Sequence, residues 1–256
     1  MADDTDDDRK YRAPALEKGL DILEMLAERG RPMTPSQMSA LLGRSVSELF
    51  RMIQVLEFRG YIEPSADGYR LTNRLFQLGM AQAPIKSIID VALPVMRDVT
   101  LATGQSCHLV VPSEDQIVVV ARIEAPGDLG YSVRVGYRRP IIDATSGLMM
   151  YGKASEAAKA ALRARLEPLH GERRVRAFVA EAEAAAAEGH ARRPSDFVGG
   201  VTDVVAPVMG VDGIIATLIC PHIERLPRVC DLDAVPAILI EGAGRISREM
   251  TAASQA

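Results

Sequence analysis

The stretch GRSVSELFRMIQVLEFRGYIE, residues 43–63, predicts a helix from about Ser45 to Arg59 that ends at Gly60, before an extended segment. One side of this helix carries the apolar residues of a buried stripe: Leu49, Met52, Ile53 and Leu56. The opposite side carries hydrogen-bonding residues at steps of four and three: Ser47, Arg51 and Gln54. A helix that only packs against a core needs no such residues on its surface. The stretch therefore indicates a helix that recognises something.

The elements around this helix follow the order of a winged helix-turn-helix. PALEKGLDILEMLAERG, residues 14–30, predicts a first helix whose apolar stripe comprises Leu16, Leu20, Leu23, Leu26 and Ala27. Thr34 is expected to cap a second helix, with Gln37 at the capping-box position and Gly43 as its end. After the third helix, extended pieces at 61–63 and 69–72 flank Asp67-Gly68, a dipeptide typical of hairpins. Three helices followed by a hairpin indicate this DNA-binding fold.

In such a fold the third helix lies in the major groove of DNA. Arg51 can bind guanine and Gln54 adenine, while Val46 or Phe50 can meet a thymine methyl group. Arg44 and Arg70 are natural phosphate contacts. Glu48 either accepts from cytosine or only stabilises the first turn of the helix. Taken alone, a helix with these residues would more often be a solvated surface, and it is the order of the elements that favours DNA. The predicted DNA-binding residues are Arg44, Ser45, Val46, Ser47, Phe50, Arg51, Gln54 and Arg70.

The remaining chain predicts a second unit. A linker helix is expected over 74–88, ending near Pro84, and then a helix that stops at Gly104. Strands are expected at 105–111, 116–124, 131–136, 199–209 and 213–220, and helices around 145–153, 155–166, 173–189 and 232–251. Without strict βαβ alternation, these indicate an α+β unit on a mainly antiparallel sheet. The predicted divisions are a disordered acidic tail at 1–10, the winged helix at 11–73, the linker, and a C-terminal domain at 89–252.

Composition excludes several classes of protein. The net charge of −4 argues against a protein that is basic throughout, but five Asp among the first eight residues supply much of the acidity. No long apolar run predicts a membrane span, and the acidic N-terminus differs from a secretory signal. The cysteines Cys107, Cys220 and Cys230 form no CxxC pair, as expected in a reducing cytoplasm.

Motifs for catalysis or cofactors are missing from the sequence. GLMMYGKA, residues 147–154, approaches a nucleotide-binding P-loop, but Ala follows Lys153 where a magnesium-binding hydroxyl is needed. The four His show no zinc-ligand spacing, and we find no nucleophile elbow. We therefore expect no metal, no cofactor and no enzyme activity.

The N-terminal stretch resembles the DNA-binding domain of IclR-type bacterial transcriptional regulators. The resemblance rests on Ala15-Leu16, Leu20, Ile22-Leu23, Gly43, Ser47, Arg51, Leu56, Gly60-Tyr61 and Tyr69-Arg70-Leu71. It departs from the family at Glu48, where a small hydroxyl residue is usual, and at Ser45-Val46, where Pro-Lys is frequent. The stretches TGQSCHLVV, RVGYRRPIIDATSGLMMYG and GGVTDVVAPVMGVDGIIATLIC are similar to the family's GAF-like effector domain. Coverage extends over nearly the whole chain after residue 14.

The resemblance implies a pocket for a small organic effector. DATSG precedes a helix, whose N-terminal N–H groups can receive an anion. By period two, Val201, Asp203 and Val205 share one face of a strand, as do Ala216, Leu218 and Cys220 of the next, and the resemblance implies that these faces line the pocket. The expected effector-binding residues are His108, Asp143, Ala144, Thr145, Ser146, Gly147, Met150, Val201, Asp203, Val205, Leu218 and Cys220.

Asp143 and Asp203 stand where the family often carries His or Tyr and Cys or Ser. Two carboxylates would repel a dicarboxylate, so we expect a ligand with a hydroxyl or amine for Asp203 and an apolar, even aromatic, body against Met149, Met150 and Leu218. Structural alternatives remain open. Asp143 could cap the helix, Asp203 could pair with Arg122 or Arg134, His108 could be an ordinary strand residue, and the two Met could be core.

The interpretation is thus a ligand-responsive, cytoplasmic regulator of a local, catabolic operon that binds double-stranded operator DNA as a homodimer or homotetramer. The resemblance implies oligomer contacts through the first helix and the linker. The alternative is an enzyme acting on small molecules with an accessory helical domain, which would need a catalytic constellation that the sequence does not show.

Overall fold

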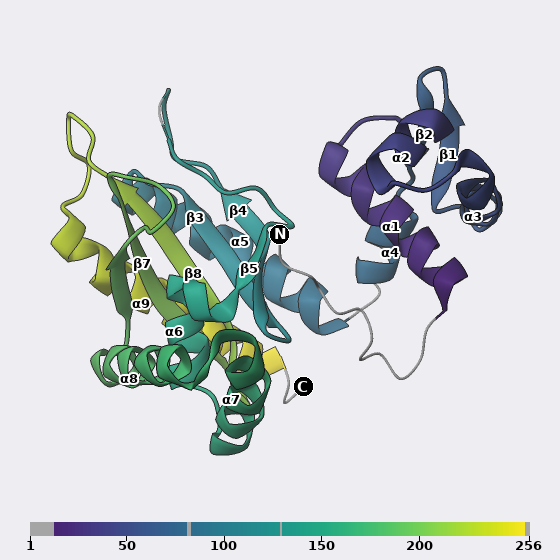
Figure 1. Ribbon diagram of the computed structural model, residues 1–256. Coiled ribbons are helices and arrows are strands. Elements are labelled where there is room, and N and C mark those ends of the chain that lie inside the picture. Colours follow the sequence, from purple (N-terminus) through teal and green to yellow (C-terminus); the bar gives the residue numbers. More distant parts are fainter. Residues whose placement is uncertain (1–12, 81–82, 129, 254–256) are drawn as a thin grey trace. The chain divides into compact units, whose positions relative to one another are not determined.

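The computed structural model describes residues 13–80, 83–128 and 130–253 (Figure 1). The chain separates into two compact units that divide between Ala83 and Pro84. The acidic tail predicted at 1–10 lies outside the described residues.

The N-terminal unit contains the expected three helices and hairpin. Its elements are α1 (Pro14–Arg29), α2 (Pro35–Leu42), α3 (Val46–Phe58), β1 (Ile62–Ser65), β2 (Gly68–Leu71) and α4 (Arg74–Met80). Thr34 caps α2, and the Gln37 side chain bonds back to the Thr34 N–H, as predicted. α1 ends at Gly30 and α2 at Gly43, both in the left-handed conformation. The core joins α1, α2, α3 and β1.

The buried stripe of α1 differs from the predicted one. Ile22, Leu23, Met25 and Leu26 are buried, whereas Leu16 and Leu20 are 64% and 47% exposed and Ala27 is also exposed. Gly19, Ile22, Leu23 and Leu26 follow the same three- and four-residue spacing as the predicted set, so periodicity alone did not decide between two adjacent stripes. The exposed leucines leave an apolar surface on α1.

The hairpin turn lies one residue earlier than predicted. Ser65 pairs with Gly68, which leaves Ala66-Asp67 as the loop. Gly68 has a φ of +121°, and a Cβ there would lie 2.3 Å from the carbonyl carbon of Met33. The glycine is needed because Tyr69 pairs with Met33, which holds the hairpin against the segment before α2.

The C-terminal unit is a six-stranded antiparallel sheet with helices on both faces (Figure 1). Strand order is β5-β4-β3-β8-β7-β6, built from β3 (Cys107–Ser113), β4 (Gln116–Ile123), β5 (Arg138–Pro140), β6 (Ala191–Pro194), β7 (Val201–Gly210) and β8 (Gly213–Ile223). One face packs on α5 (Ala83–Thr103) and α9 (Val235–Ala253). The other packs on α6 (Thr145–Gly152), α7 (Glu156–His170) and α8 (Glu172–Glu188). The α+β prediction is confirmed.

One strand prediction for this unit was wrong, and one strand was not predicted. Residues 131–136 form no strand, because the Val133 N–H bonds to the ring of His108 and Gly136 turns the chain with a φ of +86°. The short strand β5 follows instead. The edge strand β6 had no predicted counterpart. The predicted linker range, 74–88, covers α4 and the start of α5, and the last helix is preceded by a 3-10 turn, Leu232–Ala234.

Candidate functional site

The exposed face of α3 presents the residues predicted to read DNA. Val46, Ser47, Phe50, Arg51 and Gln54 are all exposed, while Leu49 and Ile53 on the opposite face are fully buried. The helix therefore separates an anchoring face from a free face that carries one guanidinium, one amide and one hydroxyl. Such a face has the chemistry to read base edges in a major groove.

A capping box fixes the start of α3. The sequence left two roles open for Glu48, accepting from cytosine or stabilising the first turn of the helix, and the structure shows it in the capping box. The Ser45 N–H donates to Glu48 Oε2 at 3.0 Å, and Ser45 Oγ accepts from the Glu48 N–H at 3.3 Å. Lys18 of α1 donates to Glu48 at 2.9 Å. The hydrogen bond from Lys18, together with those from Ser45, lowers the pKa of Glu48 to about 2. Glu48 and Ser45 thus stabilise the helix start and its position against α1.

The two predicted phosphate contacts differ in their surroundings. Arg44 is exposed directly before α3. Arg70, on β2, forms an ion pair with Glu63 of β1 at 2.7 Å. Because both partners are largely exposed, this pair contributes little energy and a phosphate can compete for Arg70.

A small cavity lies in the C-terminal unit between the sheet, the start of α6 and the segment 131–139. Its volume is about 50 Å³. The apolar walls are Val110, Ile117, Val119, Val133, Ile219 and Pro221. Polar and aromatic groups complete it: His108, Tyr131, Tyr137, Arg139, Asp143, Ala144, Thr145, Ser146, Phe197 and Asp203.

Asp203 is the buried carboxylate of this cavity. It lies on β7 between Arg193 of β6 and Pro221 of β8. Thr145 Oγ1, in the first turn of α6, donates to Asp203 Oδ2 at 3.2 Å. Burial raises the pKa of Asp203 although Thr145, Arg193 and Arg139 oppose the shift. Ser146 adds a buried hydroxyl that has no partner among the described residues. The lining of the cavity thus includes a carboxylate acceptor and a buried hydroxyl without a hydrogen-bond partner among the described residues.

His108 and Asp143 line the cavity but are held by the protein itself. The Val133 N–H donates to His108 Nε2 at 2.9 Å, and burial lowers the pKa of His108 to about 4, so the ring is neutral. Asp143 forms an ion pair with Arg174 and makes no capping bond to α6. Asp203 pairs with neither Arg122 nor Arg134. Met149 and Met150 are buried core.

Six of the expected effector-binding residues do not line this cavity: Gly147, Met150, Val201, Val205, Leu218 and Cys220. Leu218 and Cys220 lie on the opposite face of the sheet, packed against α5 and α9, and the cavity face of β8 carries Ile219 and Pro221 instead. Gly147 has a packing role, because a Cβ there would lie 1.8 Å from the carbonyl oxygen of Ile141.

Four aromatic or cationic residues at the cavity were missed: Tyr131, Tyr137, Arg139 and Phe197. The rings of Tyr137 and Phe197 stack at 6.3 Å, and the Arg139 guanidinium lies 4.7 Å from the centre of the Phe197 ring. Arg139 also forms an ion pair with Asp196 at 2.5 Å. Aromatic residues make up only 4% of the sequence, and three of them line this cavity. Their scarcity was the available signal that these aromatic residues are candidates for a binding site.

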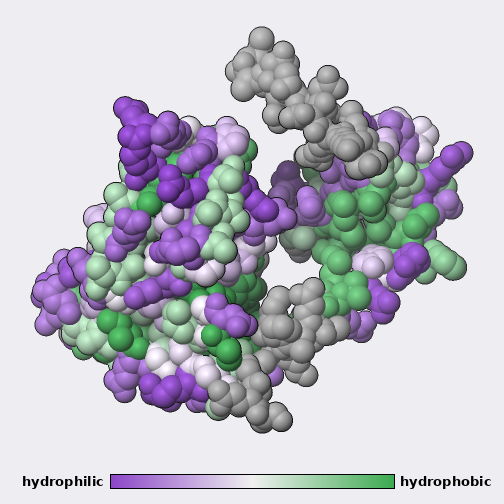
Figure 2. Space-filling model, turned by 90° about the horizontal axis from the view of Figure 1, so that it is seen from below, coloured by the Kyte–Doolittle hydropathy of each residue, from purple (hydrophilic) through white to green (hydrophobic). Residues whose placement is uncertain are grey.

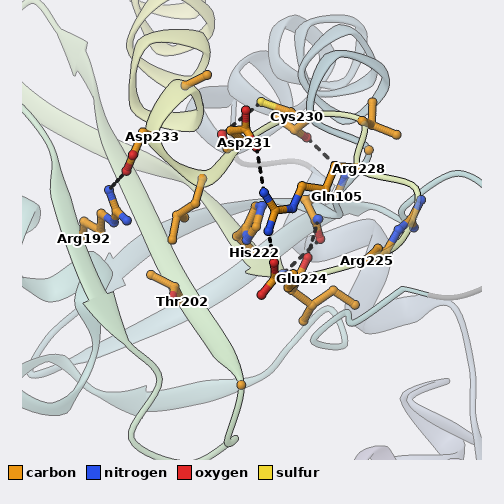
Figure 3. Close-up of a pocket in the computed structure, with 17 residues that line it drawn as sticks. Gln105, Arg192, Thr202, His222, Glu224, Arg225, Arg228, Cys230, Asp231 and Asp233 are labelled. Carbon is orange, nitrogen blue, oxygen red and sulfur yellow. Dashed lines mark hydrogen bonds and ion pairs between the residues drawn. The ribbon is translucent and has the colours of Figure 1, made fainter.

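A second, more open cavity of about 780 Å³ lies near the start of α9 (Figure 3). Five of its six Asp, Glu and Arg side chains are paired with one another: Arg192 with Asp233, and Arg228 with Glu224 and Asp231. The sixth, Arg225, donates to the Pro126 carbonyl. The Gln105 amide is bonded to the Ile223 backbone through both its nitrogen and its oxygen. None of the predicted effector-binding residues lines this cavity, and it lacks the aromatic walls of the smaller one.

The structure describes residues 13–80, 83–128 and 130–253. No group of three or more His, Cys, Asp or Glu in these ranges is placed to hold a metal ion. Within the same ranges, no helix is both long and apolar enough to cross a bilayer.

Comparison with known families gives two matches along the chain. The IclR helix-turn-helix domain matches residues 15–66, and the C-terminal domain of IclR bacterial transcriptional regulators matches residues 82–248. Together these two domains follow the order of the two structural units.

Among curated proteins, the regulator KdgR of Escherichia coli is 29% identical over 131 residues, which are 50% of this chain and 49% of KdgR. The repressor YiaJ of the same species is 25% identical over 143 residues, 55% of this chain and 51% of YiaJ. The chain thus matches about half the length of these relatives. They are transcriptional regulators, not enzymes.

Solved structures share the fold. An IclR homologue from Microbacterium hydrocarbonoxydans, complexed with 4-hydroxybenzoate, superposes with a TM-score of 0.76 at 21% identity and covers 92% of this chain and 98% of its own. HmgR of Pseudomonas aeruginosa gives a TM-score of 0.70 at 23% identity, covering 93% and 100%.

Proposed function

Because the chain belongs to the IclR family of bacterial transcriptional regulators, we propose that it is a ligand-responsive, DNA-binding regulator of a local, catabolic operon. The exposed face of α3 is the observation that carries the proposal, because its polar residues face away from a fully formed core. Its place of action is the cytoplasm, where a bacterial operator lies. No observation favours an enzyme over a regulator.

The DNA-reading role is tested with a gel shift on the DNA upstream of its own gene at a fixed, stated salt concentration. Arg51→Ala should weaken specific binding by about 1–3 kcal/mol. Arg173→Ala removes the same charge from an exposed position on α8 and serves as the matched control. Equal binding by Arg51→Ala and the control would show that Arg51 does not contact the bases of the operator.

The effector proposal rests on the small cavity of the C-terminal unit. Apolar and aromatic walls, with Asp203 as acceptor, favour a small ring that carries a hydroxyl or an amine. A structural relative holds 4-hydroxybenzoate, which makes this acid a sensible first probe. Isothermal titration should show heat of binding for the wild type and a clear loss for Asp203→Ala. Unchanged affinity in that variant would end the role assigned to Asp203.

The homo-oligomer proposal rests on exposed apolar residues of the N-terminal unit. Leu16 and Leu20 of α1 and Leu75, Phe76 and Leu78 of α4 are exposed, and Figure 2 shows apolar surface gathered on this unit, on the right of the view. Such patches mark association surfaces. Sedimentation should show a dimer or tetramer that Leu20→Glu weakens, while Leu169→Glu, an exposed leucine on α7, leaves it unchanged.

A further inference from the structure

The loop between β6 and β7 contributes Phe197 to the wall of the small cavity. It carries Asp196 and Phe197 and ends in Gly199-Gly200, with a φ of +79° at Gly200. The Ser195 N–H donates to the Val201 carbonyl at 2.8 Å and pins the base of the loop. Phe197 lines the cavity while remaining 48% exposed, so it lies at the border with solvent.

The cavity has no room for a ring while this loop is in place. Its volume of about 50 Å³ is far below the ~300–1,000 Å³ of ordinary ligand sites. The other walls belong to β3, β4, β7, β8 and α6, whose backbones are bonded within the sheet or helix. The irregular segments 131–137 and 195–200 are the parts that can move at low cost. A ligand of ring size must displace one of them.

The residues of this loop make the contacts that a ligand would make. Among the described residues that line the cavity, Arg139 is the one with a permanent positive charge, and the Asp196 carboxylate occupies it at 2.5 Å. The next residue, Phe197, stacks its ring on Tyr137 and lies under the Arg139 guanidinium. A carboxylate on arginine with an aromatic ring beside it is the pattern that an aromatic acid would make.

We propose that Asp196-Phe197 is a built-in substitute for an aromatic carboxylic acid, and that the effector displaces it by taking over Arg139 and Tyr137. This inference rests on the proposed effector role of the cavity and names the ligand class. The loop then acts as an internal competitor. It lowers the apparent affinity for the acid by the fraction of molecules in which Arg139 is already occupied.

The first test is isothermal titration of the full chain with 4-hydroxybenzoate and with phenol, which lacks the carboxylate. Asp196→Asn should bind 4-hydroxybenzoate about fivefold tighter, because the loss of an ion pair of this kind frees Arg139. Phenol should also gain affinity in Asp196→Asn, because it needs the same space, but Arg139→Gln should weaken binding of the acid and not of phenol. Asp212→Asn, an exposed carboxylate at the β7–β8 turn, is the matched control for net charge. Equal or weaker binding of the acid by Asp196→Asn would overturn the inference.

The second test needs no ligand at first. The chain has no Trp, so Phe197→Trp places a single reporter on the loop. Quenching by acrylamide should increase when Arg139→Gln or Asp196→Asn is added, and also when 4-hydroxybenzoate is added without a second substitution. A fall in quenching on ligand addition would mean that the ring closes over the ligand, which contradicts displacement.

The aromatic-acid inference and the regulator proposal are tested by different experiments. If neither the wild type nor Asp196→Asn binds benzoate, phenylacetate or 4-hydroxybenzoate at millimolar concentration, the aromatic-acid inference is overturned. The gel shift of the unsubstituted chain on the DNA upstream of its own gene is independent of that result. A normal shift would leave the regulator assignment standing, and a failed shift would remove it whatever the loop does.

Discussion

Acidification should destabilise the C-terminal unit through His108. The ring is buried on β3, and its burial together with Arg122 lowers its pKa from 6.5 to about 4. Between these values the unfolded chain binds a proton that the folded chain does not, so stability falls as pH falls below 6.5 towards 4. For this one residue, the free energy of unfolding should drop by about 2 kcal/mol between pH 7.5 and pH 5.

The perturbation that isolates this effect is His108→Gln, which keeps an acceptor for the Val133 N–H but does not titrate. Urea unfolding of both proteins at pH 7.5, 6 and 5 gives the pH dependence of the free energy of unfolding. The wild type should lose about 2 kcal/mol more than the variant over this range. His170→Gln, at the end of α7, should retain the wild-type dependence.

Histidine proton shifts measured by NMR across the same range report the pKa directly, since the chain has four His to assign. A His108 resonance that titrates near 6.5, or wild-type and His108→Gln profiles that run parallel, would refute the reasoning. The ring would then be solvated or paired in a way that the hydrogen bond from Val133 excludes.

Three further predictions concern packing, capping and charge. Gly147→Ala should destabilise the C-terminal unit by more than about 2 kcal/mol, as urea unfolding will measure, because the new methyl group would lie 1.8 Å from the Ile141 carbonyl oxygen. Ser45→Ala should cost about 1 kcal/mol of stability by removing the cap of α3, with a lower thermal midpoint and weaker operator binding in the gel shift. Asp203→Asn should raise the thermal midpoint at pH 7, because burial raises the pKa of Asp203 and its ionised form opposes folding. The gain should shrink at low pH, where the wild-type carboxyl is also neutral, and a gain that grows on acidification would contradict this.

Local signals in the sequence were sufficient for the start of α2 and the ends of α1 and α2 in the N-terminal unit. Thr34 with Gln37 and the terminating Gly30 and Gly43 act through bonds within a few residues, and all three were read correctly. The stripe of α1 needed more than local information. Which of two neighbouring stripes becomes buried depends on where α2 and α3 lie, and Leu16 and Leu20 therefore ended at the surface.

Several residues of the cavity could not be predicted from the sequence. Alternation along β8 shows that Leu218 and Cys220 share a face, but both faces of this sheet are covered by helices, so alternation cannot say which helices they meet. The segment 131–136 alternates like a strand, yet its backbone bonds to a histidine ring of β3. Arg139, Asp196 and Phe197 meet only through the fold, since 57 residues separate the first two along the chain.

The charges in the cavity decide how an acid can lie there. The start of α6, predicted from DATSG as an anion receptor, already faces a carboxylate, because Thr145 in its first turn donates to Asp203. A ligand carboxylate placed at the same helix end would meet the charge of Asp203 and be repelled. Arg139 is then the available cation, and releasing it requires that Asp196 leave. In the proposed binding mode, a ring hydroxyl would donate to Asp203 and the ligand carboxylate would bind Arg139, so a hydroxylated aromatic acid would satisfy both groups where a dicarboxylate would satisfy one.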